Sequence, residues 1–349
     1  MSLRVLLLAD THLGFDLPLT PRVRRRRRGP DFLANYELAL APALAGEVDL
    51  VVHGGDVFHR ARPHHTLVAM AFEPLRRVAD RGIPVFVVPG NHERSRIPHA
   101  RFASHPLIHI FDRPRTFRLT IRGVRVALLG FPYERHVVRK RMPALIQQTG
   151  WLPGQDDVAL LCVHHCFEGA TVGSANFTFR RGPDVIRVRD VPAGVTAVLT
   201  GHVHRHQVLE ADLFGRPLPA PILYPGSTER TAFTEMGETK GTLLLEIGTG
   251  GPSGPRIRSR FIPLPTRPMC RADIHPRGID PGALARHVRR VAAAFPSDAV
   301  LRLRVHGRLR KDAMTVLSAA GMRALVPPTM NVDVQLVDAP RFRVASRPT

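Results

Sequence analysis

The segment LVVHGGDVFH, residues 50–59, indicates the fold most directly, because a short apolar run ends abruptly in Gly, Asp and His residues. Apolar runs of about four to eight residues bounded by Gly and polar residues are typical of buried strands. Four further segments end in the same way: VLLLADTH (5–12), FVVPGNHE (86–93), LLCVHH (160–165) and AVLTGHVH (197–204). We therefore expect five buried strands that each end in polar side chains.

Helical segments between these strands indicate the fold class. In LVAMAFEPLRRVADRG, residues 67–82, the apolar residues recur with helical spacing, and Gly82 ends the pattern. Strands that alternate with helices predict an α/β core, in which ligands bind beyond the carboxyl ends of the strands. The Asp, Asn and His residues of all five segments are expected at that end.

A second, smaller domain is expected after the segment PLPTRP, residues 263–268. Just before it, residues 242–247 and 256–264 predict a β-hairpin. After it we expect a small α/β domain with strands at 269–274, 299–305 and 331–337 and helices at 281–295 and 311–325. The expected domains are residues 1–265 and 266–349.

Composition favours a polyanionic substrate, because 50 Lys and Arg against 29 Asp and Glu give a net charge of +21. Nearly all the basic residues are Arg, so genome composition is an alternative origin of the excess. The three cysteines are too few for a disulfide framework, and no apolar run is long enough for a signal peptide or a membrane span. We expect a cytoplasmic protein without a membrane association.

The polar residues at the strand ends have the chemistry of metal ligands. Asp10 and His12 alternate on what we expect to be an extended backbone, so both can point to one side. The two oxygens of a carboxylate such as that of Asp56 can hold two cations. Further donors are one amide oxygen and three imidazoles: Asn91, His164, His202 and His204. This donor set without thiolate suits manganese, iron or zinc. Each residue alone could be an ordinary core or surface residue, whereas all of them in this order predict a metal site.

The order of these motifs resembles the calcineurin-like metallophosphoesterases, whose pattern runs D-x-H, G-D, G-N-H, H and G-H-x-H. Within that superfamily, His59, three residues after Asp56, and the segment YPGSTERTAFTE (224–235) resemble the SbcD-type DNA repair nucleases. The region after residue 265 is similar to their capping domain. The resemblance implies a four-layer α/β/β/α sandwich followed by a small α/β capping domain.

The resemblance also implies roles for the site residues. It implies two divalent metal ions, with manganese expected. One is held by Asp10, His12, Asp56 and His204, and the other by Asp56, Asn91, His164 and His202, so Asp56 is the bridge. His92 is expected to face the phosphate as a catalytic residue, and His59 to orient His92 or the DNA strand. A purely structural histidine is the alternative for both.

Three local features leave alternatives open. His165 directly follows His164 and competes with it as the ligand, although the apolar alternation of the strand favours His164. Glu93 stands where the family often has Asp, and we expect little consequence. The basic run between Pro21 and Gly29 is expected to be extended and solvated, either as a DNA-binding loop or as a surface loop without a partner. Its basic residues are Arg22, Arg24, Arg25, Arg26, Arg27 and Arg28.

We therefore predict a manganese-dependent DNA phosphodiesterase that acts as a 3′-to-5′ exonuclease and endonuclease on double-strand breaks or replication ends. The resemblance implies a homodimer and an SMC-like ATPase partner of the SbcC type, although the chain ends shortly after the last predicted strand. One alternative is a metal-dependent phosphatase or phosphodiesterase for nucleotides or small phosphoesters. Another is a DNA-binding scaffold without catalysis.

Overall fold

The computed structural model describes residues 2–337, with gaps at 19–20, 22, 24, 94–96, 98–99, 250–253, 277–278, 308 and 310. The chain forms two compact units. Residues up to 18 and from 28 to 266 make the larger unit, and residues 19–27 join the segment from 267 onward in the smaller unit. The basic run thus includes chain that packs with the smaller unit, which the sequence analysis did not anticipate.

The first sheet of the larger unit has the order β16-β15-β1-β2-β3-β4. Its strands are β1 (Ser2–Leu8), β2 (Leu50–His53), β3 (Val85–Val87), β4 (Ile108–Ile110), β15 (Gly241–Gly248) and β16 (Arg256–Pro263). Strands β1 to β4 are parallel, and β15 pairs antiparallel with both β1 and β16. The predicted hairpin is therefore confirmed, and it extends the parallel sheet at one edge.

The second sheet has the order β13-β14-β12-β7-β6-β5. Its strands are β5 (Arg115–Ile121), β6 (Val124–Gly130), β7 (Val158–Val163), β12 (Ala197–Thr200), β13 (Gln207–Ala211) and β14 (Pro217–Tyr224). The four central strands are parallel, whereas the edge strands β5 and β13 are antiparallel to their neighbours. Four two-residue strands lie outside both sheets: β8 (Cys166–Phe167), β9 (Thr171–Val172), β10 (Phe177–Thr178) and β11 (Val185–Ile186).

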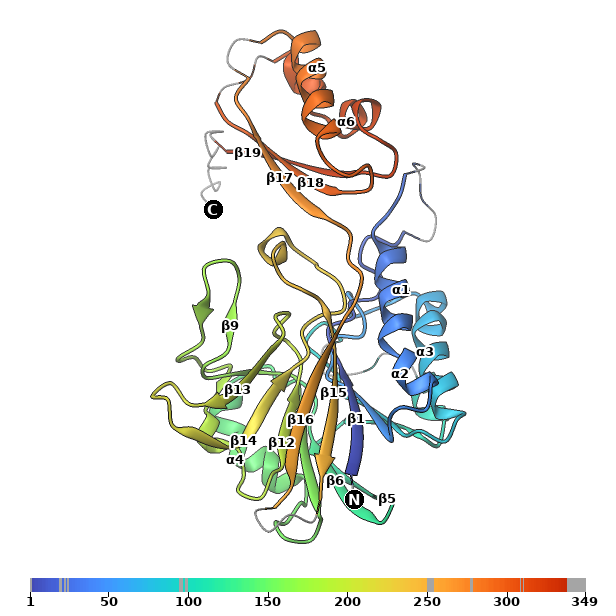
Figure 1. Cartoon of the computed structure of the whole chain (residues 1–349), viewed down its shortest axis with the longest axis vertical. Helices are drawn as coiled ribbons and strands as arrows, with labels where there is room; N and C mark the ends of the chain where they lie inside the picture. The colour runs from blue at the N-terminus through green and yellow to red at the C-terminus, as the bar shows by residue number, and fades with distance from the viewer. Residues whose placement is uncertain are drawn as a thin grey trace, which may run out of the picture. The chain divides into compact units, whose positions relative to one another are not determined.

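The two sheets pack face to face, and helices cover their outer faces. Apolar side chains of both sheets, such as Val5, Val52 and Leu160, form one buried cluster between them. Helices α1 (Gly29–Ala39), α2 (Ala41–Leu44) and α3 (His65–Ala79) pack on the first sheet, and α4 (Val138–Gln148) packs on the second (Figure 1). This is the four-layer α/β/β/α sandwich that the family resemblance implies. Strands buried on both faces explain the unbroken apolar runs.

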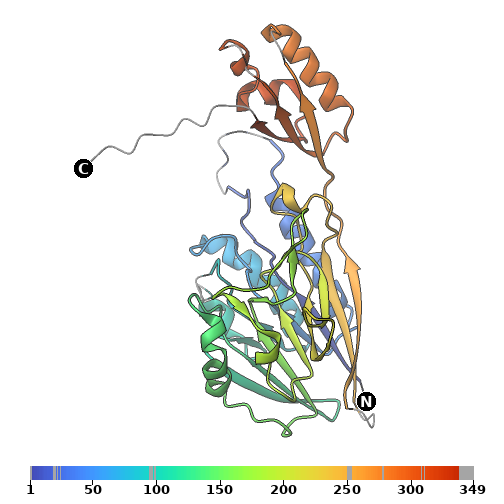
Figure 2. The same cartoon turned by 90° about the vertical axis from the view of Figure 1, so that its left-hand side faces the viewer.

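The smaller unit is a three-stranded parallel sheet with helices on one face (Figures 1 and 2). It consists of β17 (Met269–Ile274), α5 (Pro281–Ala293), β18 (Val300–Val305), α6 (Ala319–Leu325) and β19 (Asn331–Leu336). The prediction of one helix over 311–325 is wrong. A short 3₁₀ turn spans Ala313–Thr315, and α6 begins separately because the Ser318 hydroxyl caps the backbone amide of Gly321.

The assignment of residues 1–265 as a nuclease domain and 266–349 as a capping domain stays a prediction, because compactness does not reveal what a unit does. Among the described residues, no helix combines the length and the apolar character that a membrane crossing requires.

Candidate metal centre

The polar residues that the sequence singled out meet at the carboxyl ends of the central strands of both sheets. Asp10 follows β1, Asp56 follows β2 and Asn91 follows β3, all in the first sheet. His164 follows β7, and His202 and His204 follow β12, in the second sheet. Backbone hydrogen bonds from the amide of Asp10 to Gly55 and from that of His12 to Asp56 hold two of the loops together. Because parallel strands of both sheets end at the same edge, residues far apart in the sequence become neighbours.

The first predicted ligand set, Asp10, His12, Asp56 and His204, is brought together. The Nε2 atoms of His12 and His204 lie 3.0 Å apart. Nε2 of His12 lies 3.9 Å from Oδ2 of Asp56, and Nε2 of His204 lies 4.0 Å from Oδ1 of Asp10. Two imidazole nitrogens and two carboxylates thus converge on one small space.

The second predicted set, Asp56, Asn91, His164 and His202, converges in the same way. Nε2 of His164 lies 3.4 Å from Oδ2 of Asp56 and 3.1 Å from Oδ1 of Asn91. Nδ1 of His202 lies 2.8 Å from the same Asn91 oxygen. Since Asp56 borders both sets, its carboxylate lies where a bridging ligand is expected.

The backbone at these ligands adopts conformations that side chains rarely take. Asp10, His12, Asp56 and His202 all have positive φ angles, between 44° and 79°. The expectation of an extended backbone at Asp10 and His12 is therefore wrong, although both side chains still reach the same site. Strained backbone of this kind collects at functional sites and persists only where surrounding structure enforces it.

Two glycines allow the loops to approach this closely. A Cβ atom added to Gly55 would lie 2.3 Å from Nδ1 of His164, and its φ of +107° disfavours any other residue. A Cβ atom on Gly90 would lie 2.2 Å from Oδ1 of Asp56. Only hydrogen fits at either position, so these glycines are part of the construction of the site.

The structure distinguishes between the two adjacent histidines. Nδ1 of His164 lies 2.7 Å from the carbonyl oxygen of Gly54 and donates to it, so Nε2 faces Asp56 and Asn91. His165 is turned away: its Nε2 accepts from the amide of Glu134, and its ring stacks on Tyr133. Geometry therefore favours His164 as the ligand.

The buried acidic groups of the site indicate that a cation belongs there. Asp10 and Asp56 are 0% and 2% exposed, and among the described residues their ion-pair partners are all histidines. Burial raises the pKa of Asp10, while Asp56 and Asp10 raise the pKa of His164 to about 9 despite its burial. Carboxylate, amide and imidazole donors packed this tightly fit divalent ions such as manganese, iron or zinc. Two groups of the proposed ligands have metal-ligand spacing, Asp10 with His12 and His204, and Asp10 with Asp56 and His164; a third such group joins His12 to His59 and His92.

His92 lies at the rim of the cluster. Its side chain is 35% exposed, whereas that of Asp56 is only 3% exposed, and its Nε2 lies 3.9 Å from Oδ2 of Asp56. Nδ1 of His92 donates to the backbone carbonyl of His59 at 2.8 Å, so Nε2 points toward the site. The backbone of His59 therefore orients His92, while the imidazole of His59 lies 5.5 Å from that of His92 between ring centres.

Sequence reasoning did not assign a role to the acidic residue behind His204. Nδ1 of His204 lies 3.0 Å from Oε1 of Glu235, and Oε2 of Glu235 lies 2.7 Å from the ammonium of Lys240. Lys240 is 1% exposed and also pairs with Glu238 at 2.9 Å. Glu235 ends the segment 224–235 that resembles the SbcD-type nucleases, so the signal was present but was not resolved to a residue.

Glu93 was expected to matter little, but the structure gives it a structural role. The side chain is 2% exposed, and its oxygens accept 2.7 Å hydrogen bonds from the amides of Phe58 and Gly90. Burial raises the pKa of its carboxyl to about 8. Glu93 thus joins the loop that carries Asp56 to the loop that carries Asn91.

The basic run divides between different environments. Arg28 is 7% exposed, lies over the rings of Phe15 and Phe32 and pairs with Glu229 at 3.6 Å. The prediction of a solvated run is therefore wrong for Arg28, because its side chain is buried and contributes to packing within the larger unit. Arg22 and Arg24 lie outside the described residues.

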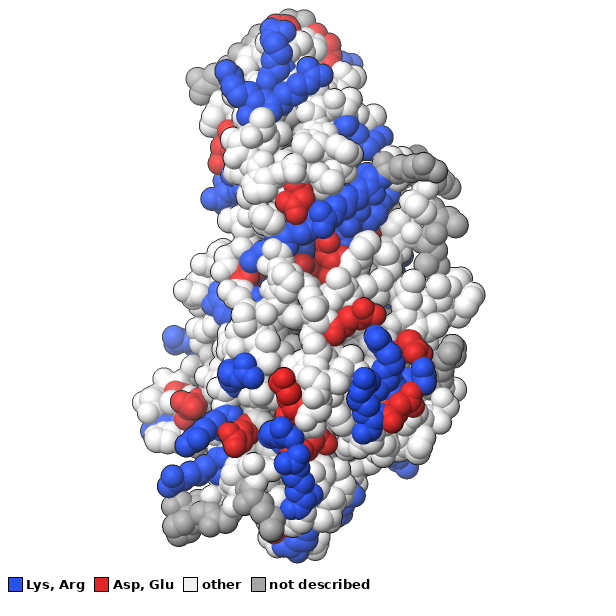
Figure 3. All heavy atoms as spheres, turned by 45° about the vertical axis from the view of Figure 1, so that its right-hand side comes forward, with Lys and Arg blue, Asp and Glu red and all other residues white. Residues whose placement is uncertain are grey.

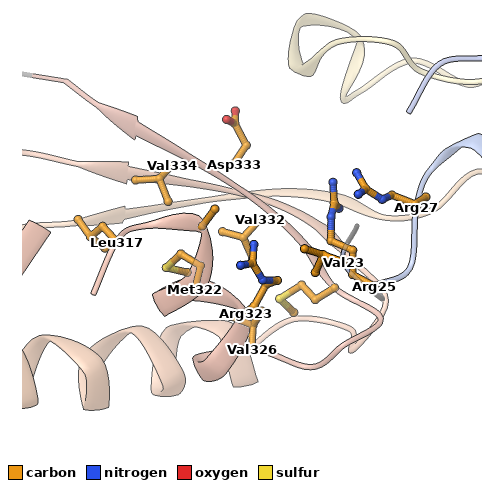
Figure 4. Close-up of a pocket in the computed structure, with 12 residues that line it drawn as sticks. Val23, Arg25, Arg27, Leu317, Met322, Arg323, Val326, Val332, Asp333 and Val334 are labelled. Atoms are coloured by element: carbon orange, nitrogen blue, oxygen red, sulfur yellow. The ribbon is translucent and has the colours of Figure 1, made fainter. Parts of the chain in front are cut away.

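Arg25, Arg26 and Arg27 pack with the smaller unit. Arg25 and Arg27 border a pocket of about 430 Å³ that is lined mainly by apolar side chains around α6 and β19 (Figure 4). The carbonyl of Arg26 accepts from the side-chain amide of Asn331, and its guanidinium lies 3.6 Å from Asp298. The backbone here is anchored, and DNA binding by these three residues stays a prediction.

Comparison with known proteins establishes the family. A family model described as calcineurin-like phosphoesterase matches residues 3–206, which contain all seven proposed ligands. The chain belongs to the calcineurin-like phosphoesterase family. Its motifs and its four-layer fold agree with this membership.

Among the relatives of this phosphoesterase are proteins named DNA double-strand break repair protein Mre11. The one from Haloferax volcanii is 31% identical over 91% of this chain and 63% of its own length. Those from Archaeoglobus fulgidus and Aeropyrum pernix are 23% and 25% identical, over 78% and 83% of this chain and 62% and 68% of their own lengths. The chain thus spans less than two thirds of the length of the first two relatives. The resemblance to DNA repair phosphoesterases is confirmed.

Proposed function

We propose that this protein is a metal-dependent nuclease that hydrolyses phosphodiester bonds of DNA in double-strand-break or replication-end processing. The observation that carries the proposal is the convergence of seven ligand-type side chains from both sheets on one site, with His92 partly exposed at its rim. The relatives named for DNA double-strand break repair support DNA as the substrate.

In this proposal two divalent ions, with manganese as the expected metal, are held by the two sets described above. Asp10, His12, Asp56 and His204 hold one ion, and Asp56, Asn91, His164 and His202 hold the other. When bound, such a pair lowers the pKa of water and neutralises phosphate charge. Asp56 is the residue whose loss would affect both positions.

The protein's own residues supply orientation and proton transfer. His164 and His204 each donate through Nδ1, to Gly54 and to Glu235, so both turn Nε2 toward the site, where it would bind a metal ion. His92 donates through Nδ1 to the carbonyl of His59, which leaves Nε2 at the rim to contact the phosphate or to protonate the leaving oxygen. His59 acts on this step through its backbone oxygen.

The charge of the chain supports a nucleic acid substrate. The net charge of +21 attracts polyanions over distances of about a Debye length. On the face drawn in Figure 3, however, many Lys and Arg side chains lie beside Asp and Glu side chains, and ion pairs such as Arg76 with Glu73 account for part of them. The total charge therefore overstates the number of arginines that can bind phosphate.

Several finer features of the proposal come from the family resemblance. These are 3′-to-5′ exonuclease and endonuclease activity, a homodimer, an SMC-like ATPase of the SbcC type as a partner, and a cytoplasmic location. Arg25, Arg26 and Arg27 remain candidates for DNA contacts, whereas the burial of Arg28 argues against its inclusion.

The test compares three substrates with the full-length, chelator-treated protein after addition of manganese or magnesium. The substrates are end-labelled linear duplex DNA, end-labelled single-stranded DNA and bis-p-nitrophenyl phosphate. We expect metal-dependent cleavage of DNA and of the small diester. His92→Ala is expected to lower kcat about 10²- to 10⁴-fold while manganese binding persists. His287→Ala, a histidine on α5, is the matched control and should cleave like the wild type.

Two other outcomes would favour the alternative functions. Hydrolysis of the small diester without cleavage of any DNA would contradict the nuclease and favour a phosphatase or phosphodiesterase for small substrates. Metal binding without hydrolysis of any substrate would favour the non-catalytic scaffold.

A further inference from the structure

We propose that a second site on the larger unit, which we call the arginine pocket, binds single-stranded nucleic acid. This inference rests on the proposed function, because it assigns a substrate-binding surface to the same enzyme. The pocket has a volume of about 410 Å³ and is lined by six arginines: Arg139, Arg180, Arg181, Arg187, Arg189 and Arg216. None of the seven proposed metal ligands lines it.

The arginine pocket has an excess of positive charge that the protein does not neutralise. Its lining holds six arginines against two acidic residues, Glu168 and Asp212, and Asp190 beside it pairs with a third arginine. Three arginines have acidic partners: Arg139 with Glu168, Arg187 with Asp190 and Arg216 with Asp212, all within 2.8 Å. Within the described part of the chain, the exposed Arg180, Arg181 and Arg189 form no ion pair.

Arginines without an acidic partner that line a concave surface can bind the phosphate groups of a nucleic acid backbone. A guanidinium offers several donors in a planar fork that matches phosphate oxygens. Arg180 and Arg181 are consecutive, and Arg189 follows β11, so the free guanidinium groups come from two segments that border one hollow. Spread along a hollow in this way, they fit several phosphates of one strand better than a single anion.

The wall formed by the β13–β14 turn adds an exposed aromatic ring. Phe214 is 83% exposed, more than any other exposed large apolar side chain among the described residues. The neighbouring Leu213 is 42% exposed. A large apolar ring in water is unfavourable for stability, so a ring displayed beside unpaired arginines suggests a ligand with a flat face.

Hydrogen bonds within the β13–β14 turn fix the backbone that carries this ring. Oδ1 of Asp212 accepts hydrogen bonds from the amides of Phe214 and Arg216, at 2.8 and 3.0 Å. Gly215 adopts a φ of +79°, and its amide bonds to the carbonyl of Asp212 at 3.0 Å. The guanidinium of Arg216 lies 5.2 Å from the centre of the Phe214 ring. The ring is therefore displayed on a closed, hydrogen-bonded turn.

A positively charged groove combined with an exposed aromatic ring is the arrangement that binds single strands, because every base has a face that can stack. In a duplex the bases are already stacked on one another, so Phe214 has less to contribute there. One of the lining residues of the arginine pocket, Glu168, follows the proposed ligand His164 by four residues on the same segment of the larger unit. The unpaired arginines and the exposed Phe214 ring together suit the pocket to hold an unpaired stretch of DNA.

The experiment measures binding of a fluorescein-labelled oligo-dT strand of about 20 nucleotides to the full chain by anisotropy, with chelator present to prevent cleavage. Phe214→Ala is expected to raise Kd about fivefold to tenfold for the single strand, and less for a duplex of the same length. The double variant Arg180→Gln/Arg181→Gln is expected to raise Kd. It should also make the fall of log K with log salt shallower, with a slope smaller in magnitude by about 1.4.

Two matched controls separate the pocket from the surface as a whole. Phe177→Ala removes another exposed ring, 60% exposed on β10. Arg258→Gln/Arg260→Gln removes two exposed arginines of β16, with the same change of net charge. Both controls should bind the strand like the wild type. Hydrolysis of bis-p-nitrophenyl phosphate with manganese should be unchanged in all variants.

The outcomes that overturn the inference differ from those that overturn the proposed function. A wild type that fails to bind oligo-dT, or β16 variants that lose as much affinity as the pocket variants, would contradict the arginine pocket. Displacement of the strand by polyglutamate, with no effect of Phe214→Ala, would indicate an acidic polypeptide instead. If no DNA is cleaved but the pocket variants alone lose affinity, the nuclease fails and the pocket stands.

Discussion

Oε1 of Glu235 accepts a hydrogen bond from Nδ1 of His204 at 3.0 Å, although the two residues come from different loops of the chain. A carboxylate cannot donate, so the proton lies on Nδ1, and Nε2 of His204 faces His12 and Asp10. Lys240, buried behind Glu235, keeps that carboxylate ionised by an ion pair at 2.7 Å. This chain of three residues prepares His204 to bind a cation.

Loss of the negative charge at Glu235 is expected to weaken metal binding. In Glu235→Gln the side chain keeps its size but holds the His204 imidazole less strongly in the required tautomer. We expect the affinity for manganese to fall about 10- to 100-fold, measured by isothermal titration of chelator-treated protein. Glu37→Gln, which removes an exposed carboxylate of α1, is the control. An unchanged affinity in Glu235→Gln would show that His204 needs no such support.

Removal of Lys240 should destabilise the larger unit, because it leaves Glu235 and Glu238 buried without their cation. Lys240→Met is expected to lower the free energy of unfolding by about 3–5 kcal/mol, measured by urea denaturation. Lys140→Met, at an exposed position of α4, should change it by no more than about 0.5 kcal/mol. Equal stability of the two variants would refute this role of the buried ammonium.

A methyl group at Gly90 should disrupt the metal centre, because its Cβ would lie 2.2 Å from the Asp56 carboxylate. Gly90→Ala is expected to lose both manganese binding and hydrolysis of bis-p-nitrophenyl phosphate. Gly237→Ala is the control, since a Cβ there meets nothing within 4 Å. The amount of manganese that each variant retains after dialysis measures the loss directly. Full metal retention in Gly90→Ala would mean that the loops are looser than the structure shows.

The adjacent histidines should respond differently to truncation. His164→Ala removes a proposed ligand and is expected to lower the manganese content of the protein from two ions to one. His165→Ala removes a ring that stacks on Tyr133 and accepts from the Glu134 amide. It should reduce stability and keep both ions. Elemental analysis of dialysed protein decides between them, and the reverse pattern would make His165 the ligand.

Much of the fold and the candidate site could be predicted because both depend on local patterns. The apolar runs of β1, β2 and β7 are continuous since these strands are buried on both faces, and each run is followed by polar residues that an apolar core would not require. Parallel strands in an α/β core bring such ends to one edge. The sequence thus indicated which side chains meet, and the short distances between His12 and His204 and between His164 and Asp56 agree with it.

Other features depend on contacts that no local pattern reveals. Glu235 reaches His204 across 31 positions, and nothing in the residues around Glu235 shows that Lys240 is buried behind it. Arg28 belongs to a run whose charge suggests solvent, yet Phe15, Phe32 and Glu229 enclose it. The left-handed backbone at Asp10 and Asp56 is imposed by packing between the loops.

The central claim is that Asp56 lies between two metal ions. Anomalous diffraction from crystals soaked in manganese tests it most directly. We predict two peaks about 3.5–4 Å apart, one bordered by His12 and His204 and the other by Asn91, His164 and His202, with Asp56 in contact with both. The absence of any peak beside Asp56, or a single peak away from it, would contradict the account.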